Sequence, residues 1–360
     1  MERQADSVPR SQRTGGPDDA LHRQPLLKIE DLTIGIDRIP SWRIVDGLNL
    51  EINAGEVVAL VGESGSGKSL TALSLMRLLP PGISAMGGRI LFEGTDVLAM
   101  SQAELTHLRG GRISMIFQQP QMMLDPTSRV GTQVAESLRL HKRPARSAVR
   151  DIVVRLLSDV GIPDPALRAQ CFAHELSGGM AQRVMMAAAM SGGSSLLIAD
   201  EPTTALDVTI QVQILKLLDD QRRRLNLAIL LITHDLSIVS VLADRVAVMY
   251  AGRIVEEGPT RTILRSPRHP YTKALVQCSL LKTGADGTLI SIPGSTSKVQ
   301  EIQQGCRFQP RCPTAAASGL SERCSDREPE LDAYDAHSKC RCWAMAAVPH
   351  PAVVDQAARP

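Results

Sequence analysis

The sequence predicts an α/β fold built on a mostly parallel sheet. Two continuously apolar runs, at residues 57–61 and 196–199, and the alternation of such runs with helical patterns lead to this prediction. Strands that are apolar on both faces are typical of parallel sheets, because helices cover both sides. Strands that alternate with helices indicate the crossover units that build such a sheet. We therefore expect an α/β core with further elements attached to it.

The first expected strands precede this core. Residues 27–30 and 48–52 alternate apolar and polar side chains, as half-buried strands do. A loop through Pro40 and Trp42 is expected to join them. The buried strand 57–61 follows and leads into a glycine-rich loop and then a helix.

A mostly helical insertion is expected from about residue 119 to 185. The elements after the glycine-rich loop are expected in this order: a helix at 70–79, strands at 88–92 and 113–117, helices at 130–141, 145–160 and 180–190, a strand at 196–199, a helix at 208–225, a strand at 228–232, a helix at 236–242 and two strands at 246–250 and 253–256. The last two strands form a hairpin that turns at Ala251 and Gly252. The sequence contains no internal repeat, so we expect a single core domain.

The segment GESGSGKS follows the strand at 57–61 directly. A strand, a glycine-rich loop and a helix start form a cradle whose backbone N–H groups point at phosphate oxygens. Lys68 is placed to reach the β- and γ-phosphates, and the Ser69 hydroxyl to bind Mg²⁺. A chance glycine-rich turn is the alternative, which the preceding strand disfavours. The loop therefore predicts ATP or GTP binding by Gly62, Glu63, Ser64, Gly65, Ser66, Gly67, Lys68 and Ser69.

Two more motifs have a chemical role: an acidic pair at a strand end and a glycine-containing helix start. Asp200 ends a buried strand and suits the Mg²⁺ that bridges the β- and γ-phosphates, and Glu201 could accept a proton from the attacking water or orient it. Ser177, Gly178 and Gly179 stand at a helix start, where N–H groups offer a second anion site. Taken alone, that segment would be an ordinary helix cap.

The order of these motifs resembles that of the ATP-binding cassette (ABC) ATPases. The phosphate loop, the LSGG segment at 176–179, the acidic strand end and Thr233-His234-Asp235 carry the resemblance, which covers about residues 26–275. It implies an ABC-type P-loop nucleotide-binding domain: a RecA-like core, an antiparallel β subdomain and a helical subdomain at about 119–185. It also implies ATP and Mg²⁺ as cofactors.

The resemblance implies roles for individual residues. Glu201, His234 and Gln118 would be catalytic, with Mg²⁺ bound through Ser69, Gln118 and Asp200. Two such domains would close head to tail, so that Ser177, Gly178 and Gly179 of one face the ATP held by the other. Asp207 would lie in the loop that crosses the dimer interface, and hydrolysis would reopen the dimer. Neither Ile39 nor Trp42 is assigned as the residue that stacks on adenine.

The segment from His269 to Leu275 resembles the one that follows the core in dipeptide, oligopeptide and nickel importer ATPases. This implies a second ATPase chain in a heterodimer, two transmembrane permease subunits and a periplasmic or extracellular substrate-binding protein. The chain would be a peripheral protein on the cytoplasmic face of the cell (inner) membrane and energise peptide import. The alternatives are a soluble ABC ATPase in repair or at the ribosome, and an importer of nickel or glutathione.

Five cysteines fall in the last sixth of the chain. In a reducing compartment such a group favours metal or iron–sulfur ligation over disulfides. The segment at 305–313 resembles the cysteine segment that ends many peptide-importer ATPases. The resemblance implies a [4Fe–4S] cluster on Cys306, Cys312, Cys324 and either Cys340 or Cys342. Zinc and unligated thiols are the alternatives.

Composition excludes several other classes. Aromatic residues make up only 2% of the chain and the net charge is +2, so stacking or electrostatic binding of nucleic acid is not expected. No apolar stretch is long enough to span a bilayer, and the N-terminus has no secretory signal. We expect a disordered tail at 1–25, an ATPase domain at 26–265, a small cysteine-containing extension at 266–342 and a flexible tail at 343–360.

Overall fold

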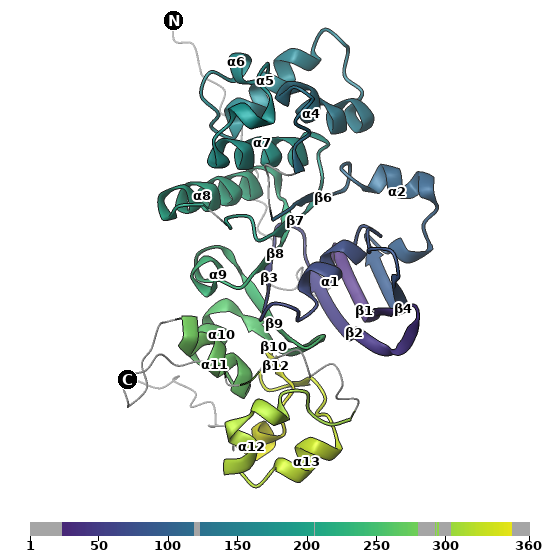
Figure 1. The fold of residues 1–360 in the computed structure, drawn as a ribbon, viewed down its shortest axis with the longest axis vertical. Coiled ribbons are helices and arrows are strands. Elements are labelled where there is room, and N and C mark those ends of the chain that lie inside the picture. The colour runs from purple at the N-terminus through teal and green to yellow at the C-terminus, as the bar shows by residue number, and fades with distance from the viewer. Residues whose placement is uncertain are drawn as a thin grey trace, which may run out of the picture.

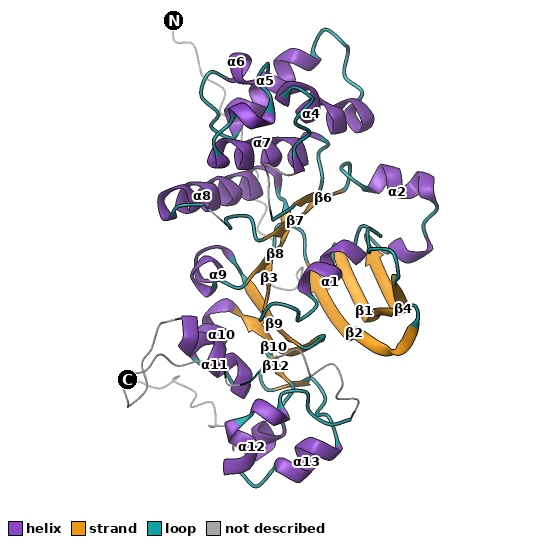
Figure 2. Cartoon of the chain, viewed as in Figure 1, coloured by secondary structure: helices purple, strands orange, loops and turns teal. Residues whose placement is uncertain are grey.

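The computed structural model describes residues 24–118, 123–204, 206–279, 292, 294 and 304–347. Residues 1–23 of the tail expected at 1–25 and residues 348–360 of the tail expected at 343–360 lie outside the described residues, and so does Ala205. Two sheets and a separate group of helices make up the molecule (Figures 1 and 2).

The larger sheet has the strand order β11-β12-β10-β9-β3-β8-β7-β6. Its strands are β3 (Val57–Val61), β6 (Ile113–Ile116), β7 (Leu196–Asp200), β8 (Ala228–Thr233), β9 (Arg245–Tyr250), β10 (Arg253–Pro259), β11 (Asp332–Ala333) and β12 (Lys339–Cys340). Strands β9, β3, β8, β7 and β6 run parallel. Strands β3, β7 and β8 are buried along their whole length. The parallel core predicted from the apolar runs is therefore confirmed.

Both faces of β3 are covered, which explains why its sequence is apolar throughout. Val57, Ala59 and Val61 belong to a core shared with the helices around α4 and α7. Val58 and Leu60 belong to a second core, shared with the smaller sheet. Because side chains alternate along a strand, each face contributes to one core.

The smaller sheet is antiparallel, with the order β2-β1-β4-β5. Its strands are β1 (Leu27–Ile36), β2 (Ile39–Ile52), β4 (Ile83–Phe92) and β5 (Thr95–Asp96). The expected loop through Pro40 and Trp42 is wrong, because both residues lie within β2. The pairing of β2 with β1 already begins at Ile39, which lies opposite Ile36. Strand β2 is an edge strand, where proline is tolerated because the outer N–H groups have no partner strand.

The helices lie in three places (Figure 1). Their bounds are α1 (Lys68–Ser74), α2 (Gln102–Leu108), α4 (Val130–Ser137), α5 (Val149–Asp159), α6 (Pro165–Arg168), α7 (Gly178–Ser191), α8 (Val208–Leu225), α9 (Leu236–Leu242), α10 (Thr260–Arg265), α11 (Pro270–Ser279), α12 (Pro313–Ala317) and α13 (Ser321–Asp326). Helices α4–α7 form the group at the top of the figure. Helices α1, α2 and α8–α11 accompany the sheets, and α12 and α13 lie at the bottom.

Several helical segments differ from the expectation, among them the helix expected at 70–79, which ends at Ser74. The helix expected at 130–141 continues after Ser137 as a π-helical turn, Leu138–Lys142. Helix α2 was not expected at all, although Ser101 and Glu104 form a capping box at its start. The spacing of a serine three residues before a glutamate is the signal that could have revealed it.

The C-terminal extension is joined to the core through the larger sheet. Strand β12 pairs with β10, so that Cys340 lies opposite Glu256. A 3₁₀ helix, Trp343–Ala347, ends the described part of the chain. In that part no helix combines the length and apolar character needed to cross a bilayer.

Candidate nucleotide site

Four neighbouring parallel strands end at the predicted site residues. Gly62 follows β3, His234 follows β8, Asp200 ends β7, and Gln118 lies two residues after β6. Because carboxyl ends of parallel strands meet at one edge of a sheet, loops from distant parts of the sequence converge there. The order β3-β8-β7-β6 thus brings together residues that are up to 172 positions apart.

The phosphate loop adopts a conformation that only glycine permits at two positions. Gly62 and Gly67 have φ angles of 155° and 107°. A Cβ atom on Gly62 would collide with the carbonyl oxygen of Met249, and one on Gly67 would lie 2.9 Å from the Met249 side chain. The glycines therefore let the loop pass directly against β9 and lead into α1.

Lys68 is buried, with 7% of its surface exposed, and its ammonium group lies inside the loop. Nζ donates hydrogen bonds to the carbonyl oxygens of Gly62 at 2.8 Å and Glu63 at 2.9 Å, and to Ser66 Oγ at 3.3 Å. Burial lowers the pKa of Lys68, while the charges of Glu201, Asp200 and Glu63 act in the opposite direction. The loop thus holds one cation at its centre, where a phosphate would find a partner.

The Glu201 carboxylate is contacted by side chains that follow two other strands, β8 and β6, and by one from its own loop. Its Oε1 lies 2.9 Å from Nδ1 of His234, and its Oε2 accepts hydrogen bonds from Gln118 Nε2 at 2.7 Å and Thr204 Oγ1 at 2.9 Å. Burial raises the pKa of Glu201, but the bonds from His234 and Thr204 outweigh it, so the pKa lies below its usual value. The carboxylate is therefore ionised at neutral pH.

The backbone also fixes Glu201. Its φ angle is 47°, in the left-handed region that non-glycine residues rarely adopt. Its N–H donates to the carbonyl oxygen of Ile232 on β8 at 2.8 Å, which holds it against the neighbouring strand. Strained backbone of this kind is frequent at functional sites, where surrounding contacts hold it.

The pKa of Asp200 shifts in the direction opposite to that of Glu201. Burial and the charge of Glu201 raise the pKa of Asp200, while a hydrogen bond from Ser69 and the charge of Lys68 lower it, and the net shift is upward. A divalent cation beside Asp200 would reverse this shift. The Ser69 hydroxyl, one Asp200 carboxylate and the Gln118 amide oxygen are ligand types that suit Mg²⁺, which usually completes its shell with water and phosphate oxygens.

The structure places Ser177 and Asp207 in capping positions that face outward. Ser177 is exposed and caps α7 by accepting a bond from Met180 N at 3.3 Å. Asp207 is exposed and caps α8 in the same way, through Ile210 N at 3.0 Å. Helix α7 lies among the upper helices, whereas α1 lies beside the sheets (Figure 1). Ser177, Gly178 and Gly179 are therefore not part of the phosphate cradle of their own chain.

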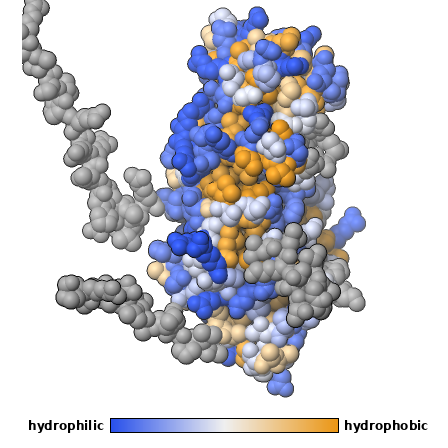
Figure 3. Space-filling model, turned by 90° about the vertical axis from the view of Figure 1, so that its left-hand side faces the viewer, coloured by the Kyte–Doolittle hydropathy of each residue, from blue (hydrophilic) through white to orange (hydrophobic). Residues whose placement is uncertain are grey.

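Apolar side chains are exposed near Asp207. Val208, Val212 and Val241 have exposed fractions of 74%, 62% and 76%. Figure 3 shows apolar surface in the middle of the face on which α8 and α9 lie. An exposed apolar patch of this kind is typical of a protein–protein contact.

Sequence reasoning missed three residues that contact this site. Thr204 donates to Glu201, as described above. The Tyr271 hydroxyl accepts a hydrogen bond from Glu63 N at 2.9 Å, and Arg311 pairs with the Glu63 carboxylate. Thr204 lies three residues from Glu201, so its spacing was a usable signal. Nothing local in the sequence signals contacts that span more than 200 residues.

The cysteines separate into two environments. Cys306, Cys312, Cys324 and Cys342 line one small cavity together with Phe308, Leu320 and Trp343. Cys340 does not line it and lies on β12 instead, opposite Glu256. Burial raises the pKa of Cys306 to about 12, and it also raises those of Cys324 and Cys342. In the described part of the chain, no three His, Cys, Asp or Glu side chains are grouped tightly enough to hold a single metal ion.

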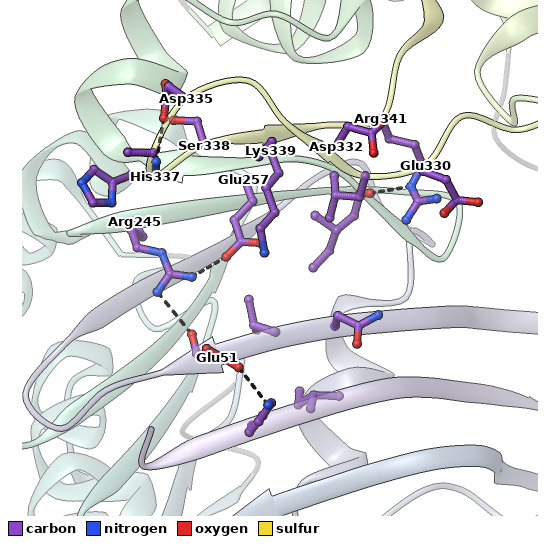
Figure 4. A pocket seen from close by; sticks show the side chains of 18 of the residues that line it. Glu51, Arg245, Glu257, Glu330, Asp332, Asp335, His337, Ser338, Lys339 and Arg341 are labelled. Atoms are coloured by element: carbon purple, nitrogen blue, oxygen red, sulfur yellow. Dashed lines mark hydrogen bonds and ion pairs between the residues drawn. The ribbon is translucent and has the colours of Figure 1, made fainter. Parts of the chain in front are cut away.

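A larger cavity, of about 820 Å³, lies away from the phosphate loop, between β1, β2 and the segment 330–341. Arg245 lies at its wall beside Glu257 and the backbone of Glu51, and Lys28 pairs with Glu51 at 3.4 Å (Figure 4). None of the predicted site residues lines it. It therefore does not form part of the candidate nucleotide site.

Comparison with known families gives two matches. Residues 45–204 match the ABC transporter family, and residues 255–318 match the family described as the oligopeptide/dipeptide transporter C-terminal region. The first match spans the phosphate loop, the LSGG segment and the acidic strand end. The second spans the segment from His269 to Leu275 and the first two clustered cysteines.

Individual proteins agree with these matches. The chain is 42% identical to the dipeptide transport ATP-binding protein DppD of Escherichia coli, over 88% of this chain and 96% of that protein. It is 42% identical to the probable D,D-dipeptide transport ATP-binding protein DdpD of E. coli, over 89% and 97%. The solved ATP-binding cassette MJ0796, a dimer bound to ADP and Pi, matches with a TM-score of 0.58 and 25% identity, over 65% of this chain and 99% of that one. CbiO1 from Clostridium perfringens matches with a TM-score of 0.58 and 29% identity, over 68% and 97%.

Proposed function

The chain belongs to the ABC transporter family, as an ATPase subunit of the oligopeptide/dipeptide transport group, and we propose that it drives the import of peptides by an ATP-dependent cycle of dimer closure and reopening. The observation that carries this proposal is the convergence of Lys68, Asp200, Glu201 and His234 at one sheet edge. The match to the transporter C-terminal region favours a transport role over the alternatives of repair or ribosome function.

In this cycle the phosphate loop binds ATP. The N–H groups of residues 62–69 and the Lys68 ammonium group contact the phosphates. Ser69, Asp200 and the Gln118 amide oxygen would hold Mg²⁺, whose charge would offset that of the phosphates. Gln118 can do this without leaving Glu201, because Nε2 makes that hydrogen bond and Oε1 is a different atom.

Glu201 acts on the attacking water. Its ionised carboxylate accepts the proton or orients the water, and His234 holds that carboxylate at the correct angle through the 2.9 Å contact. His234 is 65% exposed, so it can also turn toward a γ-phosphate bound beside it. The resemblance implied a catalytic role for Glu201 and for His234, whereas the contact between the two side chains was not expected.

The site is completed by another chain. Ser177, Gly178 and Gly179 would contact the ATP held by a second ATPase subunit, since their own phosphate loop lies elsewhere. The exposed valines beside Asp207 would be covered in that dimer. As an importer ATPase, the chain acts with transmembrane permease subunits. We further propose a heterodimer of ATPases, two permease chains and a periplasmic or extracellular substrate-binding protein, with this chain on the cytoplasmic face of the cell (inner) membrane.

The four cysteines that share a cavity support a [4Fe–4S] cluster as the group that they hold. Four thiolates can also hold a single zinc ion, which stays the alternative. A cubane takes one thiolate on each of four irons, so its ligands stand further apart. Of the two candidates for the fourth ligand, the shared cavity favours Cys342 over Cys340.

Reconstitution tests the proposed function. The chain is co-expressed with its permease and ATPase partners and purified in detergent. Uptake of a labelled dipeptide into proteoliposomes is then measured in the presence of the substrate-binding protein, with and without ATP. We expect ATP-dependent uptake that Glu201→Gln abolishes while the complex still assembles. A chain that hydrolyses ATP but neither co-purifies with a permease nor supports uptake contradicts the transport role. Nickel and glutathione uptake in the same vesicles tests the alternative substrates.

A further inference from the structure

Arg311, in the C-terminal extension, reaches the phosphate loop. Its guanidinium group donates two parallel hydrogen bonds to the Glu63 carboxylate, Nη1 to Oε2 at 2.8 Å and Nη2 to Oε1 at 3.1 Å. The two residues are 248 positions apart. Arg311 is only 8% exposed and also bonds to the Tyr250 hydroxyl at 3.2 Å. Bidentate pairs of this kind fix direction as well as distance.

Glu63 is therefore held at its side chain and at both of its backbone polar atoms. Arg311 holds its carboxylate, the Tyr271 hydroxyl accepts the bond from its N–H at 2.9 Å, and Lys68 bonds to its carbonyl oxygen at 2.9 Å. Two of these partners come from the part of the chain that follows the ATPase core. The second residue of the phosphate loop thus cannot move without breaking contacts to that part.

The same extension supports the loop from a second side. Arg307 donates hydrogen bonds to the Asp46 carboxylate and to the carbonyl oxygen of Ala251. Gly252, next along that turn, donates from its N–H to the carbonyl oxygen of Ser66 in the loop at 2.9 Å. Arg307 therefore stabilises the turn at Ala251 and Gly252, and this turn contacts the phosphate loop at Ser66.

Aromatic packing joins these two contacts into one rigid piece. Phe308 is 2% exposed and lies between Arg307 and Arg311 in the sequence. Its ring centroid lies 5.2 Å from that of Tyr250 and 5.5 Å from that of Tyr271. The segment 306–312 is therefore packed against Tyr271, which contacts the loop, and against Tyr250, which contacts Arg311.

Charge gives this arrangement a functional consequence. An unpaired Glu63 carboxylate would repel the phosphates that enter the loop, and Arg311 cancels this charge where burial keeps screening by water weak. Resting on the proposed function, that this loop binds ATP, we propose that Arg311 is a positioning residue for the phosphate loop and that the extension sets the affinity for ATP through the Arg311–Glu63 pair. In this proposal Arg311 acts on the nucleotide through Glu63, whose carboxylate it holds.

A double-mutant cycle on the purified full-length chain tests the proposal. The dissociation constants of Mg-ATP and Mg-ADP are measured for the wild type, Arg311→Ala, Glu63→Gln and the double variant. We expect Arg311→Ala to weaken ATP binding roughly tenfold, within the usual range of coupling between sites, and to weaken ADP binding less, because ADP carries less charge. The double variant should recover most of the loss, since it leaves no unpaired carboxylate.

The controls separate positioning from simple loss of stability. Arg327→Ala removes an exposed arginine of the same extension and should leave both constants unchanged. If Arg311→Ala does not fold, Arg311→Lys, which keeps the charge but loses the bidentate geometry, and Tyr271→Phe, which removes the bond to Glu63 N, take its place and should each weaken ATP binding. An Arg311 variant that melts earlier but binds ATP as the wild type does overturns the proposal, as does a double variant no better than the single one. A wild-type chain that binds no ATP overturns the proposed function instead.

Discussion

Nδ1 of His234 lies 2.9 Å from Oε1 of Glu201, across the gap between the ends of β8 and β7. The other carboxylate oxygen of Glu201 accepts bonds from Gln118 and Thr204. Three chain segments therefore orient one ionised carboxylate, and its left-handed backbone leaves it little freedom of its own. A general base needs both a defined direction and the ionised state, and this arrangement supplies the two together.

Glu201→Gln should abolish most hydrolysis and leave ATP binding intact. The amide has nearly the same shape but cannot accept the proton of the attacking water, so we expect turnover to fall about 10²- to 10⁴-fold. The variant should accumulate as an ATP-bound closed dimer, which size-exclusion chromatography with Mg-ATP detects. Glu104→Gln, in the exposed cap of α2, is the matched control. Undiminished phosphate release from Glu201→Gln would rule out the role of Glu201.

Thr204→Val should move the acid side of the pH profile of hydrolysis to higher pH. Thr204 donates to Glu201 and helps to keep the pKa of that carboxyl below its usual value. Without this bond the pKa of Glu201 rises, so protonation stops the base at a higher pH than in the wild type. The profile of kcat against pH measures the shift. Thr106→Val, on exposed α2, should leave the profile unchanged, and an unshifted profile in Thr204→Val would show that the bond does not tune Glu201.

Lys68→Ala should weaken ATP binding rather than only slow hydrolysis. The ammonium group is the cation inside the loop and would give up its bonds to Gly62 and Glu63 for bonds to phosphate. The loss of two charge-assisted hydrogen bonds of about 1.5 kcal/mol each weakens binding by roughly 100-fold. The rise in melting temperature that ATP produces in the wild type measures this directly. A Lys68→Ala chain that ATP stabilises as strongly as the wild type would contradict the assignment.

The sequence predicted the parts of the fold that depend on local patterns. Apolar runs located β3, β7 and β8. The phosphate loop, the Asp200-Glu201 pair and His234 follow or end these runs, so the sheet edge where they meet could be foreseen. The course of β2 through Pro40 could not, because it depends on which strand lies at the sheet edge. The contact of Arg311 with Glu63 was equally hidden, since no periodicity relates residues 248 positions apart.

Asp46→Asn should make the chain less stable above the usual pKa of aspartate and flatten its pH dependence. Burial raises the pKa of Asp46, but Arg253, Arg307 and Arg43 outweigh it, so the folded pKa lies below the usual 3.8. A carboxyl whose pKa is lowered on folding contributes stability that is present above the unfolded pKa and is lost as pH falls through the folded one. The wild type should therefore lose melting temperature below about pH 4, and Asp46→Asn should lose less. Glu30→Gln, which removes a partly exposed acid from a surface pair, should keep the wild-type pH trend more closely.

Cys342→Ser and Cys340→Ser should differ in metal content, although the two residues are only two positions apart. Cys342 lines the cavity with Cys306, Cys312 and Cys324, whereas Cys340 lies on β12 opposite Glu256. Burial raises the pKa values of Cys306 and Cys324, so these two thiols stay protonated unless a metal replaces the proton. A cluster takes four thiolates, so it should form only when all four ligands are present. After anaerobic purification, we expect Cys340→Ser to contain as much iron and as much acid-labile sulfide as the wild type. Cys342→Ser should have lost most of both. Equal loss in the two variants would contradict the choice of ligand. Zinc instead of iron in the wild type would show that these thiols bind zinc and not a cluster. A wild type with neither metal would show that the thiols are unligated.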